Sequence, residues 1–160
     1  MEILYTTSAI RNAIRELFSD PKRRRVAIVA FVGADAEAFL PYPQGLELVC
    51  WPKAGATDAD VISRLIQRGA SVKFSDSLHM KVYWAAGKGA IITSANLSDS
   101  ALGSERLKEL GIKVPAKSVD IDRLLLQADS RAVKKSELSK LIRASNNLMR
   151  WKNKCCNPFR

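Results

Sequence analysis

Residues 78–98 read LHMKVYWAAGKGAIITSANLS and predict two strands joined by a tight turn. In the first half, apolar residues alternate with other residues at the period of a half-buried strand, so His79 and Lys81 should point the same way. A Gly-Lys-Gly turn then returns the chain into a second apolar run, which carries Ser94 and Asn96 to the end of a neighbouring strand. The pattern therefore predicts that an imidazole, an ammonium, a hydroxyl and a carboxamide meet at one sheet edge.

This set of groups suits the chemistry of a phosphate ester. Lys81, Ser94 and Asn96 can donate hydrogen bonds to phosphoryl oxygens, and a neutral imidazole can attack phosphorus or transfer a proton near neutral pH. No metal is required. The alternative is that His79 is a half-exposed strand histidine and that residues 94–96 form an ordinary turn.

The order of these residues resembles the HKD motif of the phospholipase D superfamily, H-x-K…D…G-S-x-N. His79, Lys81, Ser94 and Asn96 match the motif with the expected separations. Two positions depart from it, because Ala86 stands in place of the aspartate and Thr93 in place of the glycine before the serine. Residues 109–112, Glu-Leu-Gly-Ile, resemble the continuation of the family pattern, and the resemblance covers roughly residues 5–130.

The resemblance implies a phospholipase D-like α/β sandwich with a mixed central β-sheet flanked by helices and one HKD motif per chain. It also implies a two-step displacement, in which one histidine forms a phosphohistidine and a second protonates the leaving oxygen. His79 is the single histidine of the chain, so this mechanism requires a homodimer in which two copies of His79 face each other. Lys81, Ser94 and Asn96 would bind the phosphoryl oxygens. A downstream carboxylate would orient His79, for which Glu109 is the first candidate and Glu105 the second, the alternative being that both are surface acids.

Positive charge is concentrated in two parts of the chain. The 160 residues include 26 Lys and Arg against 16 Asp and Glu, a formal net charge of +10. Residues 134–160 contain eight basic residues and one acidic residue, which gives +7 of that total. Such clusters are typical of nucleic-acid binding through phosphates. The predicted contacts are Lys22, Arg23, Arg24, Arg25, Lys140, Arg143 and Arg150. The alternatives are a solvated surface or a contact with anionic lipid.

Composition points to a cytoplasmic globular protein without a cofactor. Hydrophobic residues make up 47% of the chain, and no run approaches the length of a spanning helix. The charged N-terminus does not resemble a signal peptide, so we expect no stable membrane association. Three cysteines, Cys50, Cys155 and Cys156, provide neither a disulfide framework nor zinc-site spacing, and we expect no metal.

The order of predicted elements is that of an α/β fold with crossovers. Strands are expected over residues 26–32, 46–51, 72–74 and 78–84, and a helix after residue 57 is expected to be capped by Thr57. The expected division is a phospholipase D-like catalytic domain over residues 1–133, followed by a basic C-terminal helix and tail over residues 134–160. Trp51, Tyr83 and Trp84 are interpreted as core or sheet-face aromatics.

The leading hypothesis is a metal-independent phosphodiesterase that cleaves nucleic acid as a homodimer. A second is a binding module that keeps the fold but has lost catalysis, which the Ala86 and Thr93 departures favour slightly. A third is a phospholipid-processing enzyme, which the lack of a second motif and of a membrane anchor disfavours. The sequence does not discriminate DNA from RNA.

Overall fold

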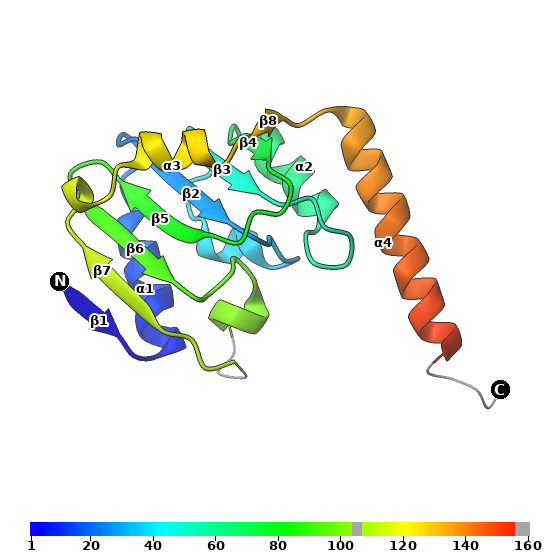
Figure 1. The fold of residues 1–160 in the computed structure, drawn as a ribbon, viewed down its shortest axis with the longest axis horizontal. Helices are drawn as coiled ribbons and strands as arrows, with labels where there is room; N and C mark the ends of the chain where they lie inside the picture. The colour runs from blue at the N-terminus through cyan, green and yellow to red at the C-terminus, as the bar shows by residue number, and fades with distance from the viewer. Residues whose placement is uncertain (104–106, 156–160) are drawn as a thin grey trace.

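A computed structural model describes residues 1–103 and 107–155 and contains an eight-stranded mixed sheet (Figure 1). The strand order is β1-β7-β6-β5-β2-β3-β4-β8. The strands are β1 (Glu2–Leu4), β2 (Arg25–Val29), β3 (Leu46–Cys50), β4 (Ser71–Phe74), β5 (Lys81–Ala85), β6 (Gly89–Thr93), β7 (Gly111–Val114) and β8 (Arg131–Ala132). Strands β2, β3 and β4 are parallel, and every other pairing is antiparallel.

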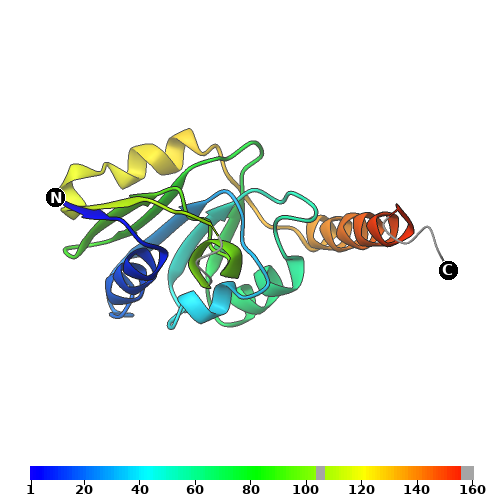
Figure 2. The ribbon, with the colours of Figure 1, turned by 90° about the horizontal axis from the view of Figure 1, so that it is seen from below.

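Helices cover both faces of this sheet. The helices are α1 (Thr7–Leu17), α2 (Ala59–Gln67), α3 (Ile121–Gln127) and α4 (Lys135–Cys155), with the short turns η1 (Ala36–Phe39), η2 (Asp99–Gly103) and η3 (Ala116–Ser118). Figure 2 shows α1 and α2 on one face of the sheet and α3 on the other. This is the predicted α/β sandwich, with a mixed central sheet flanked by helices.

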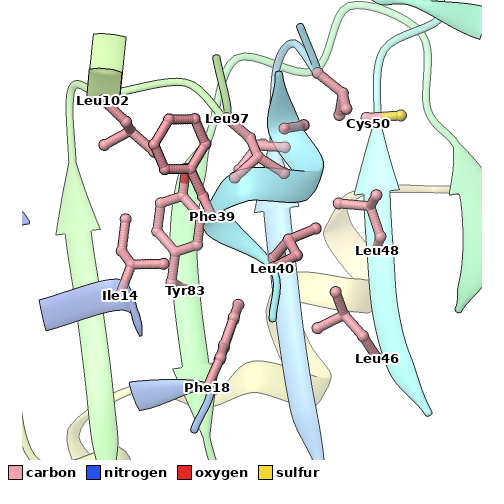
Figure 3. Close-up of a cluster of buried hydrophobic side chains, with 14 of the residues drawn as sticks. Ile14, Phe18, Phe39, Leu40, Leu46, Leu48, Cys50, Tyr83, Leu97 and Leu102 are labelled. Atoms are coloured by element: carbon pink, nitrogen blue, oxygen red, sulfur yellow. The ribbon is translucent and has the colours of Figure 1, made fainter. Parts of the chain in front are cut away.

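The larger core lies between one face of the sheet and helices α1 and α2, and Figure 3 shows part of it. The α1 residues Ile10 and Ile14 are fully buried there, as the helical spacing of apolar residues predicts. A smaller cluster on the opposite face joins Val26 and Ile28 of β2 to Ile121 of α3. Because alternate residues of β2 enter opposite clusters, this strand is buried on both sides, as its continuous apolar run predicts.

Three details differ from the sequence-based expectations. Strand β2 ends at Val29 rather than at residue 32. Strand β5 begins at Lys81 rather than at residue 78, so His79 lies on the loop that enters the strand. Helix α2 is capped by Asp58, whose carboxylate accepts hydrogen bonds from the backbone N–H groups of Asp60 and Val61, and not by Thr57. The Thr57 hydroxyl instead donates 2.6 Å to the carbonyl of Trp51, which ties the loop after β3 to the start of α2.

Helix α4 extends beyond the sheet (Figure 1), and apolar residues of its first turns pack on the domain. Leu141 is buried and Leu138 packs against the larger core. Further along, α4 and the loop after β3 enclose a groove of about 490 Å³, and the Ser145 hydroxyl accepts from the N–H of Gly55 across it at 3.3 Å. Within the described residues, no helix combines the length and apolarity needed to cross a membrane.

The topology brings several chain segments to one edge of the sheet. Strands β2, β3, β4 and β6 end at this edge, and β5 and β7 begin there. His79, Lys81, Ser94 and Asn96 all lie at these strand ends, as the sequence predicts. Because it carries the residues predicted to be catalytic, we refer to this edge as the catalytic edge.

Candidate active site

His79 and Lys81 are in direct contact at the catalytic edge. The Nζ atom of Lys81 lies 3.2 Å from Nε2 and 3.3 Å from Nδ1 of His79, and it donates 3.0 Å to the His79 carbonyl. An ammonium can donate to a ring nitrogen only where that nitrogen carries a lone pair. His79 is exposed, whereas Lys81 is buried, so the pair presents the imidazole to solvent with a cation beneath it.

Asn96 is fixed by the backbone that follows β2. Its Oδ1 accepts from the N–H of Phe31 at 3.1 Å, which leaves its NH2 group to donate elsewhere. The adjoining backbone is held by two more bonds, Leu97 N–H to the Phe31 carbonyl at 3.2 Å and Gly33 N–H to the Leu97 carbonyl at 2.8 Å. Gly33 permits this close approach, because a Cβ there would lie 2.7 Å from the Cβ of Ser98.

Ser94 bonds to Glu109, the predicted orienting carboxylate. The Ser94 hydroxyl donates to the Glu109 carboxylate and accepts from the N–H of Leu110 at 3.1 Å. The single hydroxyl proton of Ser94 is thus already used, so donation to a phosphoryl oxygen requires Glu109 to give way. Glu109 bonds to Ser94 rather than to His79 in the described structure, so its orienting role stays a prediction. Glu105, the second candidate, lies outside the described residues.

Burial and the charge of Glu109 shift the pKa values of Lys81 and Tyr83. Burial lowers the pKa of the Lys81 ammonium, and the nearby Glu109 carboxylate opposes this effect. Burial raises the pKa of the Tyr83 phenol, and Glu109 raises it further. Tyr83 is fully buried and donates to the carbonyl of Ala95 at 3.3 Å, which anchors the segment between Ser94 and Asn96.

The two departures from the motif lie in different places. Ala86 follows β5 at the edge opposite to the catalytic edge, where its N–H donates to the Arg24 carbonyl at 3.0 Å. It lies five positions after Lys81 along extended chain, a span of roughly 17 Å, so the side chain at position 86 does not reach the site. Thr93 instead borders the site, and its hydroxyl donates 2.8 Å to the Leu110 carbonyl and accepts from the N–H of Ala95 at 3.1 Å.

The four basic residues 22–25 lie at the start of β2, at the edge opposite to His79. Arg23 pairs with Asp20 at 3.0 Å and donates to the Ala86 carbonyl. Arg24 pairs with Glu47 at 2.7 Å and with Asp122 at 2.8 Å. Contacts of Lys22, Arg23 and Arg24 with nucleic acid stay predictions, and any such contact would lie far from His79.

Arg25 corrects the predicted nucleic-acid-binding set. It is 1% exposed, and its guanidinium donates to backbone carbonyls of Tyr42 at 2.5 Å and Gln44 at 2.6 Å, with longer contacts to Pro21 and Arg23. Burial lowers the pKa of this guanidinium, which the Asp20 carboxylate opposes. The side chain is enclosed by the loop that precedes β3, so it supports that loop and does not contact a phosphate.

Replacing Arg25 by methionine is expected to lower the free energy of unfolding by about 3 kcal/mol, because several buried carbonyls lose a charged donor. The measurement is urea denaturation of both proteins. Lys22→Ala is the matched control, since Lys22 is exposed and its removal should change the free energy by less than about 0.5 kcal/mol. Equal stabilities of the wild type and Arg25→Met would contradict a structural role for Arg25.

The three predicted phosphate contacts on α4 are accessible. Lys140, Arg143 and Arg150 are exposed, and none of them forms an ion pair with another residue of the described chain. The groove beside α4 is lined by Gly33 and by residues 54–60, which follow β2 and β3 at the catalytic edge. Of the predicted phosphate contacts, those on α4 are therefore the ones on the same side of the molecule as the catalytic edge.

Two aromatic residues at the catalytic edge were not part of the predicted site. Phe31 and Trp51 each follow a strand, β2 and β3 respectively, and their rings stack at a centroid distance of 5.7 Å. Trp51 is half-buried and packs against the smaller core cluster, as expected for a core or sheet-face aromatic, and its ring also meets Phe31 at the sheet edge. An aromatic residue directly after each of two neighbouring parallel strands is the sequence signal that identifies such a pair.

Within residues 1–103 and 107–155, no group of three or more His, Cys, Asp and Glu side chains is arranged to hold a metal ion. Cys50 is a free, buried thiol whose pKa is raised by burial.

Comparison with known proteins finds similar solved structures but no similar sequence. No protein-family model matches the chain, and no curated protein sequence matches it. Nuc from Salmonella typhimurium, a phospholipase D family member, is similar with a TM-score of 0.57 at 15% identity over 84% of this chain and 97% of that one. NucT from Helicobacter pylori is similar with a TM-score of 0.52 at 16% identity over 89% and 95%. TrmBL2, an archaeal chromatin protein with a novel mode of DNA binding, has a TM-score of 0.50 at 10% identity over 82% and 54%. At these identities the similarity establishes the fold alone.

Proposed function

Because this chain has the phospholipase D-like fold, we propose that it is a metal-independent phosphodiesterase that hydrolyses nucleic acid through a phosphohistidine. One observation carries the proposal: an exposed imidazole lies 3.2 Å from a buried ammonium at a sheet edge that also holds Asn96. This arrangement combines a nucleophile with donors for developing phosphoryl charge.

The reaction proceeds in two displacements. A ring nitrogen of His79 forms a bond to phosphorus while the bond to the leaving oxygen breaks, and that oxygen takes a proton from His79 of a second protomer. Water then attacks the phosphohistidine, the bond between nitrogen and phosphorus breaks, and the second imidazole takes up the proton of the water. The chain has a single histidine, so the active form is a homodimer.

Other residues of the catalytic edge stabilise the phosphoryl group. Lys81 and the NH2 group of Asn96 donate to its oxygens as negative charge develops. Ser94 either donates there after releasing Glu109, or holds Glu109 in position beside Lys81. In the second case the bond between Ser94 and Glu109 joins the end of β6 to the segment before β7, which keeps the carboxylate near Lys81.

Nucleic acid is the substrate class that the charge distribution favours. The net charge is +10, and α4 carries exposed basic residues on the side of the catalytic edge. Lys140, Arg143 and Arg150 contact phosphates in this proposal, and the domain of residues 1–133 performs the chemistry. The protein acts in the cytoplasm and requires no cofactor.

A second candidate is a nucleic-acid-binding module without catalysis. The similarity to a chromatin protein supports this candidate, as does Thr93 at a position that is glycine in the motif. Ala86 no longer supports it, because that position lies at the opposite edge of the sheet.

Cleavage in excess EDTA tests the proposal. End-labelled single-stranded and double-stranded DNA and RNA are incubated with the purified protein, and products are resolved on a denaturing gel. We expect cleavage of at least one substrate by the wild type in EDTA. Salt-sensitive binding of every substrate without cleavage would contradict the phosphodiesterase and leave the binding module.

Mixing wild-type and His79→Ala protomers tests the homodimer. If both copies of His79 are needed, equal amounts of the two chains, co-expressed with different tags, should yield active wild-type pairs in about one quarter of the dimers. Activity should then vary with the square of the wild-type fraction, and light scattering should report a dimer. A linear dependence, or full activity from a monomer, would contradict the shared site.

A further inference from the structure

The aromatic pair of Phe31 and Trp51 forms an ordered platform at the catalytic edge. The ring planes are inclined by 27° at a centroid distance of 5.7 Å, which is a stacked arrangement. The backbone of Trp51 is fixed on both sides, since its N–H donates to the Ala30 carbonyl at 3.0 Å and its carbonyl accepts from the Thr57 hydroxyl. Both rings are half-buried, so each keeps part of its surface in solvent.

A cation lies over this platform. The Nζ atom of Lys53 is 4.8 Å from the centroid of the Trp51 ring and 5.7 Å from that of Phe31. Lys53 is exposed, and its long side chain can move aside at little cost, because a cation–π contact at an exposed site is weak. The platform thus combines aromatic faces with a positive charge.

The platform adjoins the proposed catalytic residues. Val29 and Lys81 are the last register partners at this end of the antiparallel pairing of β2 with β5, and Phe31 and His79 each lie two residues beyond that end of the strand pair. The N–H of Phe31 also donates to Oδ1 of Asn96. A phosphate held between His79 and Asn96 would therefore have the platform as its immediate neighbour.

We propose that the Phe31 and Trp51 platform stacks a nucleobase next to the reacting phosphate, with Lys53 moving to a neighbouring phosphate, so that the site selects single-stranded nucleic acid. This inference rests on the proposed function, because it assigns the substrate class of the same site. Base stacking on aromatic side chains is tolerant of sequence, and an adjacent cation adds a phosphate contact. Bases in a duplex are stacked on each other and paired, so they do not offer a free face to the platform.

Binding measured without turnover tests this assignment. In a His79→Ala background, fluorescence anisotropy gives the Kd of a labelled thymidine 12-mer, of the same strand with abasic sites and of a matched duplex. We expect the intact strand to bind roughly tenfold more tightly than the abasic strand, and Trp51→Leu to remove most of this ratio, as expected when one stacking contact is lost. Trp51→Phe should retain most of the ratio, because it keeps an aromatic face.

Two controls separate stacking from loss of structure. Tyr42→Leu removes an exposed aromatic residue that precedes β3, at the opposite edge of the sheet, and should leave the ratio unchanged. Thermal melting identifies any variant that fails to fold, in which case Phe31→Leu replaces it. The same ratio in Trp51→Leu as in its parent, or equal binding of intact and abasic strands by the parent, would overturn the assignment.

The outcomes also separate this inference from the proposed function. If binding depends on the bases and on Trp51 but the wild type cleaves nothing in EDTA, the platform is supported and the phosphodiesterase is contradicted. Cleavage in EDTA with no difference between intact and abasic strands contradicts the platform alone.

Discussion

His79→Ala is expected to reduce the single-turnover rate of oligonucleotide cleavage by about four orders of magnitude or more, because it removes both the nucleophile and the proton donor of the dimer. His79 is exposed on the loop before β5, so the variant should fold with a stability within about 0.5 kcal/mol of the wild type. The measurement is a rapid-quench time course on an end-labelled strand, with circular dichroism as the check on folding.

The same variant has a chemical readout that a structural role would not affect. The wild type, quenched with base during turnover of an internally labelled strand, should retain a phosphorus label on the chain, since a phosphohistidine survives base and is lost in acid. His79→Ala should retain none. Wild-type rates of cleavage by the variant, or a label that persists in it, would show that another residue is the nucleophile.

Lys81→Met is expected to reduce kcat/KM by roughly 10²–10³-fold, the effect of removing one donor that stabilises developing charge. Methionine matches the length and the apolar stem of lysine in this buried position, so the loss is mainly that of charge. Lys113→Met is the matched control, because Lys113 lies on β7 and pairs with Glu16 away from His79. Equal losses in both variants would contradict a specific role for Lys81.

The pH dependence of kcat/KM should also show that the positive charge of Lys81 is needed. An ordinary lysine has a pKa of about 10.4. Burial lowers the pKa of Lys81, so Lys81 loses its positive charge at a lower pH than an ordinary lysine does. Activity should therefore fall as the pH rises through this lowered pKa, and the alkaline limb should be absent from the residual activity of Lys81→Met. An alkaline limb of identical position in both proteins would assign it to another group.

The charged residues illustrate where sequence reasoning stops. Arg25 and Lys22 belong to one basic run, yet one guanidinium is enclosed by backbone carbonyls and the other side chain is exposed. The difference arises from the loop before β3, which packs over the start of β2 and is distant from it in the sequence. Charge counting cannot detect such burial, because burial depends on which segments fold over a residue.

The aromatic residues show the same limit in the opposite direction. Tyr83, Trp84 and Trp51 lie in or against the core as expected. Trp51 also meets Phe31, because β2 and β3 are parallel neighbours whose ends coincide. The local sequence around either aromatic residue does not predict its contact with the other. The stacked pair therefore follows from strand order.

The sequence by itself determined the α/β class, the strand pair that carries His79, Lys81, Ser94 and Asn96, and their meeting at one sheet edge. These follow from local periodicity, turn residues and the order of a motif, all of which are encoded over short stretches of chain. Only the tertiary structure decided that Glu109 holds Ser94, that Arg25 is buried and that Phe31 stacks on Trp51. Each of these depends on contacts between segments remote in sequence, whose free energy is set by packing and register rather than by local composition.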